Sequence, residues 1–148
     1  MDGLIARAKK PYLAKTEPLP VPNDVYNQIL APEFSQSRWL FARDEAANSF
    51  VLVSLALHAY RLENKRYPEN LSQLVPKYLK KVPTDAYSAG EPLRYKLVGA
   101  KYSLYSIGPD GIDNAGRAIE NKKVATTKRQ RFLMQQESKG DYVAGVNH

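Results

Sequence analysis

The chain has 148 residues, a formal net charge of +7 and no cysteine. This length predicts one domain, and a hydrophobic fraction of 43% with 25% charged residues argues against wholesale disorder. The absence of cysteine excludes disulfide bonds, thiolate metal sites and a cysteine nucleophile.

Residues 1–36 are predicted to form an irregular lead-in. Prolines at positions 11, 18, 20, 22 and 32 argue against a continuous helix. The short piece Asn23–Leu30 predicts two helical turns, with Asn23 or Asp24 as the N-terminal cap. No signal peptide is evident, and the most apolar run, Phe50–Leu57, is too short for a bilayer, which needs about 20 apolar residues.

A long helix is predicted to begin near Ser35 or Ser37 and to end at about Asn64. Neither glycine nor proline interrupts this stretch, and apolar side chains recur along one stripe at helical spacing: Phe50, Val53, Leu57 and Tyr60. The first turns are polar. We therefore expect the helix to bury its middle and its C-terminal half, and to project at its N-terminal half.

The segments after the helix predict a small antiparallel sheet. Asn70 is expected to cap a short helix over Leu71–Val75. Leu93–Leu97 and Lys101–Ile107 alternate apolar and polar side chains, which predicts a hairpin whose apolar face packs on the long helix. Asp141–Val146 is a candidate third strand. The predicted fold class is α+β, a long N-terminal helix packed on a small antiparallel sheet, with this unit at residues 37–116.

The loop that follows the hairpin, Gly108–Gly116, is the main candidate site. Carboxylates of Asp110 and Asp113 on a glycine-bent backbone can converge on a hard cation such as calcium. Further oxygens would come from the Ser106 hydroxyl, the Asn114 amide and the carbonyls of Ile107 and Ile112. The spacing is not that of an EF-hand. An alternative is a turn whose Asp and Asn side chains bond their own backbone, and the residues alone leave both open.

Residues 117–148 are expected to form a basic, loosely ordered tail. Between Arg117 and Arg131 the basic residues are Arg117, Lys122, Lys123, Lys128, Arg129 and Arg131, against Glu120. Such a run can bind nucleic acid or another anionic polymer. We favour a solvated flank, because few aromatic residues stand in it for stacking on bases and no nucleic-acid-binding motif is present.

No catalytic apparatus is predicted. The two histidines, His58 and His148, are far apart in the sequence and have no metal-ligand spacing. No serine stands in a nucleophile elbow, and no glycine-rich loop joins a strand to a helix. We therefore do not expect an enzyme or a small-molecule substrate.

Three segments in chain order carry a family resemblance: Ala56–Pro68 (ALHAYRLENKRYP), Leu71–Pro83 (LSQLVPKYLKKVP) and Leu93–Gly111 (LRYKLVGAKYSLYSIGPDG). Together they resemble the C-terminal globular domain of the major pseudopilin of type II secretion systems, over about residues 50–116. The resemblance implies a non-catalytic subunit that assembles with other, membrane-anchored proteins on the extracytoplasmic side of the cell envelope. It also implies calcium in the loop after the last strand, with Asp110 as the strongest ligand.

The chain also departs from that family. It has no prepilin cleavage site and no long apolar start to its helix, and the segment Asp85–Gly90 differs from the family's compact DPWGxP turn. We therefore expect a relative similar to the C-terminal part of bacterial membrane-anchored proteins that use this domain, rather than a standard filament subunit.

Overall fold

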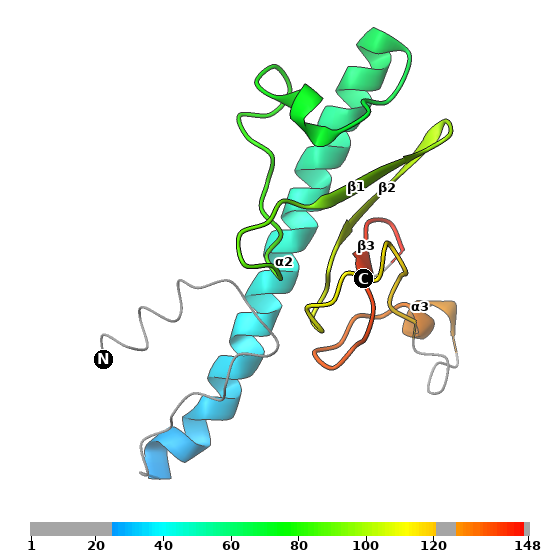
Figure 1. The fold of residues 1–148 in the computed structure, drawn as a ribbon. Helices are drawn as coiled ribbons and strands as arrows, with labels where there is room; N and C mark the ends of the chain where they lie inside the picture. Colours follow the sequence, from blue (N-terminus) through cyan, green and yellow to red (C-terminus); the bar gives the residue numbers. More distant parts are fainter. Residues whose placement is uncertain (1–24, 121–126, 147–148) are drawn as a thin grey trace.

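The computed structural model describes residues 25–120 and 127–146. Its elements are helix α2 (Val25–Asn64), the 3-10 helix η1 (Leu71–Leu74), strands β1 (Arg94–Val98) and β2 (Lys101–Ser106), helix α3 (Lys128–Arg131) and strand β3 (Tyr142–Val143). Figure 1 shows α2 as a long rod with the sheet along one side. One long helix on a three-stranded antiparallel sheet confirms the predicted α+β fold class.

Helix α2 begins well before the predicted start at Ser35 or Ser37. It has 40 residues, runs from Val25 and passes through Pro32. Proline inside a helix lacks one N–H and costs about 3 kcal/mol, but the backbone can continue on both sides of it. A long helix that buries one face offsets this cost, so residues 25–36 are helical rather than irregular. The other four prolines of the lead-in, and the caps Asn23 and Asp24, lie outside the described residues.

One face of α2 forms the core. The buried residues follow helical spacing: Trp39, Ala42, Ala46, Phe50, Val53, Ala56 and Leu57. The ring of Phe50 meets that of Tyr142 edge-to-face at 4.9 Å, so the C-terminal segment reaches the helix. Burial extends back to Trp39, further into the N-terminal half than the polar sequence there predicted. Among the described residues, no helix is long and apolar enough to cross a membrane.

The connection after α2 folds back on the helix. Leu71 and Leu74 of η1 are buried, as packing on α2 requires. The expected helix over Leu71–Val75 is a shorter 3-10 turn. Asn70 precedes it, but its side chain makes no capping hydrogen bond, and its carbonyl accepts instead from Gln73 N–H at 3.3 Å. The predicted side-chain cap is therefore wrong.

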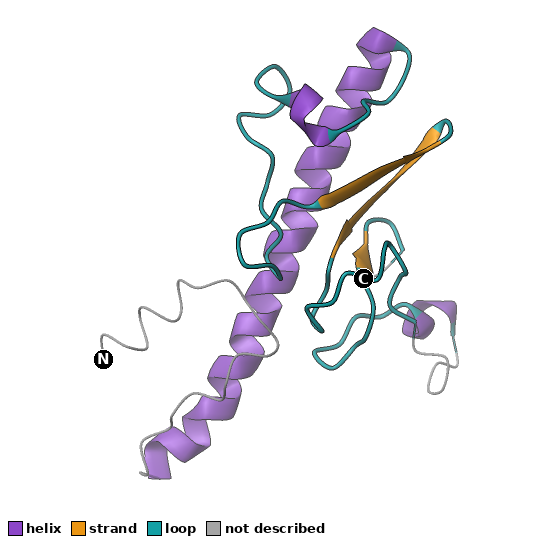
Figure 2. Cartoon of the chain, in the orientation of Figure 1, coloured by secondary structure: helices purple, strands orange, loops and turns teal. Residues whose placement is uncertain are grey.

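The sheet has the order β1-β2-β3, with both pairs antiparallel. Tyr95 pairs with Leu104 in the hairpin, and Ser106 pairs with Tyr142 at the other edge. The third strand predicted within Asp141–Val146 is β3. Figure 2 shows the hairpin tip projecting away from α2, while the base of β2 enters the loops around β3.

The segment expected to be a loose tail contributes to the core over the residues that the structure describes. Ile119 is fully buried and Met134 is 2% exposed. Ile119 N–H donates to the carbonyl of Asp141 at 3.0 Å, and Asp141 N–H donates to the carbonyl of Arg117 at 2.8 Å. This part of the chain is therefore held between the acidic loop and β3, which differs from the expectation.

Candidate functional site in the acidic loop

The acidic loop Gly108–Gly116 leaves the end of β2 and runs against the C-terminal segment. Gly108 has a φ of +70°, which favours glycine. A Cβ added to Gly108 would lie 2.5 Å from the carbonyl oxygen of Gly140. The close approach of these two backbones therefore requires a glycine, and it fixes the loop beside residue 140.

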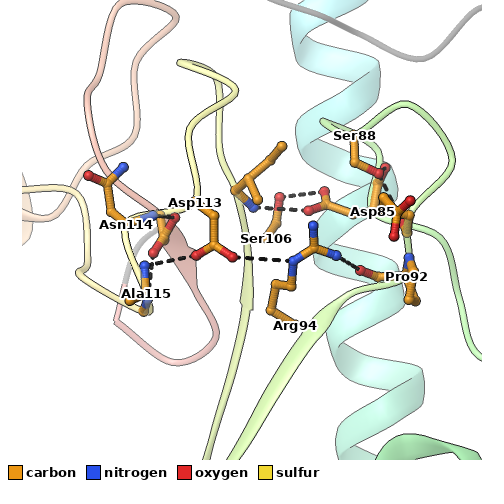
Figure 3. A network of polar contacts seen from close by, with 12 residues as sticks. Asp85, Ser88, Pro92, Arg94, Ser106, Asp113, Asn114 and Ala115 are labelled. Carbon is orange, nitrogen blue, oxygen red and sulfur yellow. Dashed lines mark hydrogen bonds and ion pairs between the residues drawn. The ribbon is translucent and has the colours of Figure 1, made fainter.

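The two candidate calcium ligands accept backbone hydrogen bonds. Asp110 Oδ1 accepts from Ile112 N–H and its Oδ2 accepts from Gly140 N–H, both at 3.0 Å. Asp113 Oδ1 accepts from Ala115 N–H at 2.8 Å, and its Oδ2 lies 3.4 Å from Arg94 Nε. Figure 3 shows Asp113 between Ala115 and Arg94. The bonds from Ile112 and Ala115 are those that the alternative prediction, an Asp-rich and Asn-rich turn, required.

The other predicted ligands are placed differently. Asn114 Nδ2 donates to the carbonyl of Ile112 at 2.8 Å. Ser106 is fully buried, and its hydroxyl donates to Asp85 Oδ1 at 2.5 Å, so it faces Asp85 (Figure 3). Within residues 25–120 and 127–146, no group of three or more His, Cys, Asp or Glu side chains could hold a metal ion. Calcium binding at Asp110, Asp113, Ser106 and Ile112 stays a prediction.

Asp85 is a buried acceptor that the sequence reading did not assign. It is 1% exposed and lies in the loop before β1, against the end of β2. Its Oδ1 accepts from Tyr87 N–H at 3.0 Å and from the Ser106 hydroxyl, and its Oδ2 accepts from Ile107 N–H at 2.9 Å. A carboxylate with this many donors fixes the loop at residues 84–92 to β2. The sequence signal was the residue type, because an aspartate in a turn often accepts a hydrogen bond from the backbone N–H two residues further on.

Asp141 is the second buried acceptor that the sequence reading missed. Its side chain is fully buried, with Asn114 N–H 3.0 Å from Oδ1 and Gly116 N–H 2.6 Å from Oδ2. Burial raises the pKa of Asp141, and the N–H groups of Asn114 and Gly116 oppose that rise. Asp141 thus fixes the acidic loop to β3. No local sequence pattern marks a contact between residues this far apart.

The two histidines and the basic segment were the other candidates that the sequence offered. His58 is exposed on α2 and donates from Nδ1 to the carbonyl of Ser54 at 2.7 Å. That contact agrees with a helix-surface histidine. In the basic segment Arg131 is ion-paired with Glu120, while Lys122 and Lys123 lie outside the described residues, as does His148. Nucleic-acid binding is untested by these contacts.

In this arrangement aspartate carboxylates join loops by accepting hydrogen bonds from backbone N–H groups. Four carboxylates, those of Asp85, Asp110, Asp113 and Asp141, accept from N–H groups of three loops, and those of Asp85 and Asp141 are buried. Such an arrangement holds the loops in fixed positions relative to one another.

Comparison with known proteins gives one relative. The chain is 25% identical over 114 residues to Type II secretion system core protein G of Pectobacterium carotovorum subsp. carotovorum, over 66% of this chain and 73% of that protein. No family model matches the chain, and no solved structure matches it.

Proposed function

We propose that this chain is a non-catalytic, pseudopilin-like structural and interaction domain that serves type II secretion or a related pilus-type assembly. The similarity to core protein G carries the proposal. The fold is consistent with it, because a long helix that supports a small sheet offers surfaces to other subunits. The partners would be other protein subunits, including membrane-anchored ones, at the extracytoplasmic side of the cell envelope.

The polar contacts support a structural role. The buried carboxylates of Asp85 and Asp141 are directed at backbone N–H groups rather than into an open cleft. A subunit of an assembly needs loops that keep one conformation when another subunit contacts them. Buried carboxylates that accept backbone hydrogen bonds fix the loop conformation in this way. The same contacts give no reason to assign a small-molecule substrate.

The test is deletion of the gene in the organism that encodes the chain. We expect secreted proteins to accumulate inside the cell and to disappear from the medium, with recovery on re-expression. A tagged copy should fractionate with the cell envelope. Unchanged secretion together with a tagged copy in the cytosol would overturn the proposal. Salt-sensitive binding of purified chain to DNA would then favour the alternative, a basic accessory module.

We also propose that the acidic loop binds one calcium ion, with Asp110 as the main ligand. Calorimetric titration of the wild type should give heat that Asp110→Ala loses, and the melting temperature should rise with calcium if only the native state binds it. Asp44→Ala is the matched control, because Asp44 is exposed on α2 away from the loop. Equal heats for the wild type and Asp110→Ala would remove the calcium claim and leave the secretion proposal intact.

A further inference from the structure

Helix α2 has a second apolar face that the sheet does not cover. Its large exposed residues include Phe41 at 74%, Val51 at 59%, Leu55 at 64% and Leu62 at 74%. Positions 41, 48, 55 and 62 are seven residues apart, and positions 44, 51 and 58 lie between them. This alternating spacing of three and four is that of the a and d positions of a coiled coil. We call Phe41, Asp44, Asn48, Val51, Leu55, His58 and Leu62 the outer seam.

All residues of the outer seam are exposed. Figure 2 shows no second long helix beside α2 in the described part of the chain. An open groove of about 390 Å³ borders the seam, and Val51, Leu55 and His58 line it together with Tyr142 of β3. Exposed apolar side chains that follow one another along a helix face beside a groove are typical of an interaction site.

Polar groups of the outer seam favour a second copy in the antiparallel direction. If Val51 of one copy faces Leu55 of the other, Asn48 faces His58. His58 donates through Nδ1 to Ser54, so its Nε2 is free to accept from the Asn48 amide. A parallel pair would instead place His58 against His58, with two acceptors facing each other. A polar residue at an a position is known to fix register and orientation in this way.

Charge supports the same direction. Arg61 lies in the last turn of α2, Lys65 and Arg66 follow the helix directly, and Glu63 is ion-paired with Lys77. Near the other end of the seam Arg38 and Arg43 balance Asp44 and Glu45, so that end carries no net charge. A parallel pair would bring the two basic ends together, whereas an antiparallel pair places each basic end beside the uncharged end and also opposes the helix dipoles.

We propose that a second copy of this chain docks on the outer seam, with its own α2 antiparallel to the first. The inference goes beyond the proposed function, because it names a self-association that does not depend on secretion. Its tests and the gene deletion can therefore fail separately.

Sedimentation equilibrium of the purified full chain tests the proposal. We expect a concentration-dependent dimer, and Leu55→Glu should raise its dissociation constant by at least about 30-fold, the effect of losing a central interface contact. Leu55 is exposed, so the variant should keep the wild-type circular dichroism spectrum. Val98→Glu is the matched control, because Val98 is 63% exposed at the hairpin tip, and it should dimerise as the wild type does.

Cross-linking tests the orientation, since the chain has no cysteine of its own. With a short thiol cross-linker, Leu52→Cys near the two-fold axis should link to its copy. Phe41→Cys should not, because the two positions would lie about 36 Å apart along the antiparallel pair. Linking at position 41 would overturn the antiparallel arrangement. A wild type that stays monomeric at every concentration would overturn the dimer, and would mean that another segment or a lipid surface covers the seam.

Discussion

Two pairs of aspartates accept backbone hydrogen bonds in different surroundings. Asp85 and Asp141 are 1% and 0% exposed, whereas Asp110 is half-buried and Asp113 is exposed. All four hold N–H groups of loops, but only the buried pair would leave donors without water if the carboxylate were lost. The comparison teaches that the prominent acidic loop is held from outside itself, by a residue near the C-terminus.

The largest effect should come from Asp85→Ala. The substitution leaves the N–H groups of Tyr87 and Ile107 and the hydroxyl of Ser106 without their acceptor in a buried place. We expect the free energy of unfolding in urea to fall by about 3 kcal/mol or more. If Asp85→Ala lowered the free energy of unfolding less than the exposed Asp113→Ala does, burial would not decide how much stability is lost.

Asp141→Asn should lower the free energy of unfolding by about 1–3 kcal/mol, because an amide N–H₂ would replace one of the carboxylate oxygens that accept from Asn114 and Gly116. The cost should depend on pH. Burial raises the pKa of Asp141 above its ordinary 3.8, so the folded chain holds this proton more tightly than the unfolded chain. The part of the stabilisation that comes from this proton is fully present below the ordinary value and is lost as the pH rises through the folded-state pKa.

The measurement for Asp141 is the difference in unfolding free energy between the wild type and Asp141→Asn at several pH values. We expect this difference to grow as the pH falls from neutral towards the ordinary value. A difference that shrinks on acidification would show that the backbone donors, rather than burial, dominate the titration.

Tyr95 gives an intermediate case, a half-buried group that donates instead of accepting. Its hydroxyl donates to the carbonyl of Pro68 at 2.7 Å, and burial raises the pKa of Tyr95 from 10.0 to about 12. Tyr95→Phe should cost about 1 kcal/mol at neutral pH. Because the unfolded chain ionises first, this contribution is lost as the pH rises through the folded-state value. Ultraviolet titration of the variant should lose one tyrosine that ionises near pH 12, and an unchanged profile would reject the assignment.

The smallest effect should come from Asp113→Asn, at under about 1 kcal/mol. Asp113 is exposed, and its ion pair with Arg94 has side chains 43% and 29% exposed, so water screens it. Urea unfolding of Asp113→Asn and Asp110→Asn side by side would sharpen the comparison. Asp110 also holds Gly140 N–H and should therefore cost more than Asp113.

Local patterns predicted the regular elements closely. The hairpin strands were expected at Leu93–Leu97 and Lys101–Ile107 and lie at Arg94–Val98 and Lys101–Ser106. The end of α2 at Asn64 was also predicted. These succeed because alternation and helical spacing are properties of neighbouring residues. The start of α2 was misplaced, since the cost of Pro32 was judged without the packing that offsets it.

The acidic loop was only half predictable. Its turn bonds, from Asp110 to Ile112 and from Asp113 to Ala115, join residues two apart and could be anticipated from residue type. Its contacts with Gly140 and Asp141 join residues 25 to 30 apart. Residue type alone does not indicate which distant segment a carboxylate will meet.

For this protein the sequence by itself determined the long helix, the hairpin and the turn-forming character of the acidic loop, because each depends on spacing within a few residues. The tertiary structure decided that Asp85 and Asp141 are buried and that residues 117–120 and 127–146 contribute to the core. It also decided that one face of α2 stays exposed. These outcomes depend on which segments exclude water from each other, and that is settled only when the whole chain is folded.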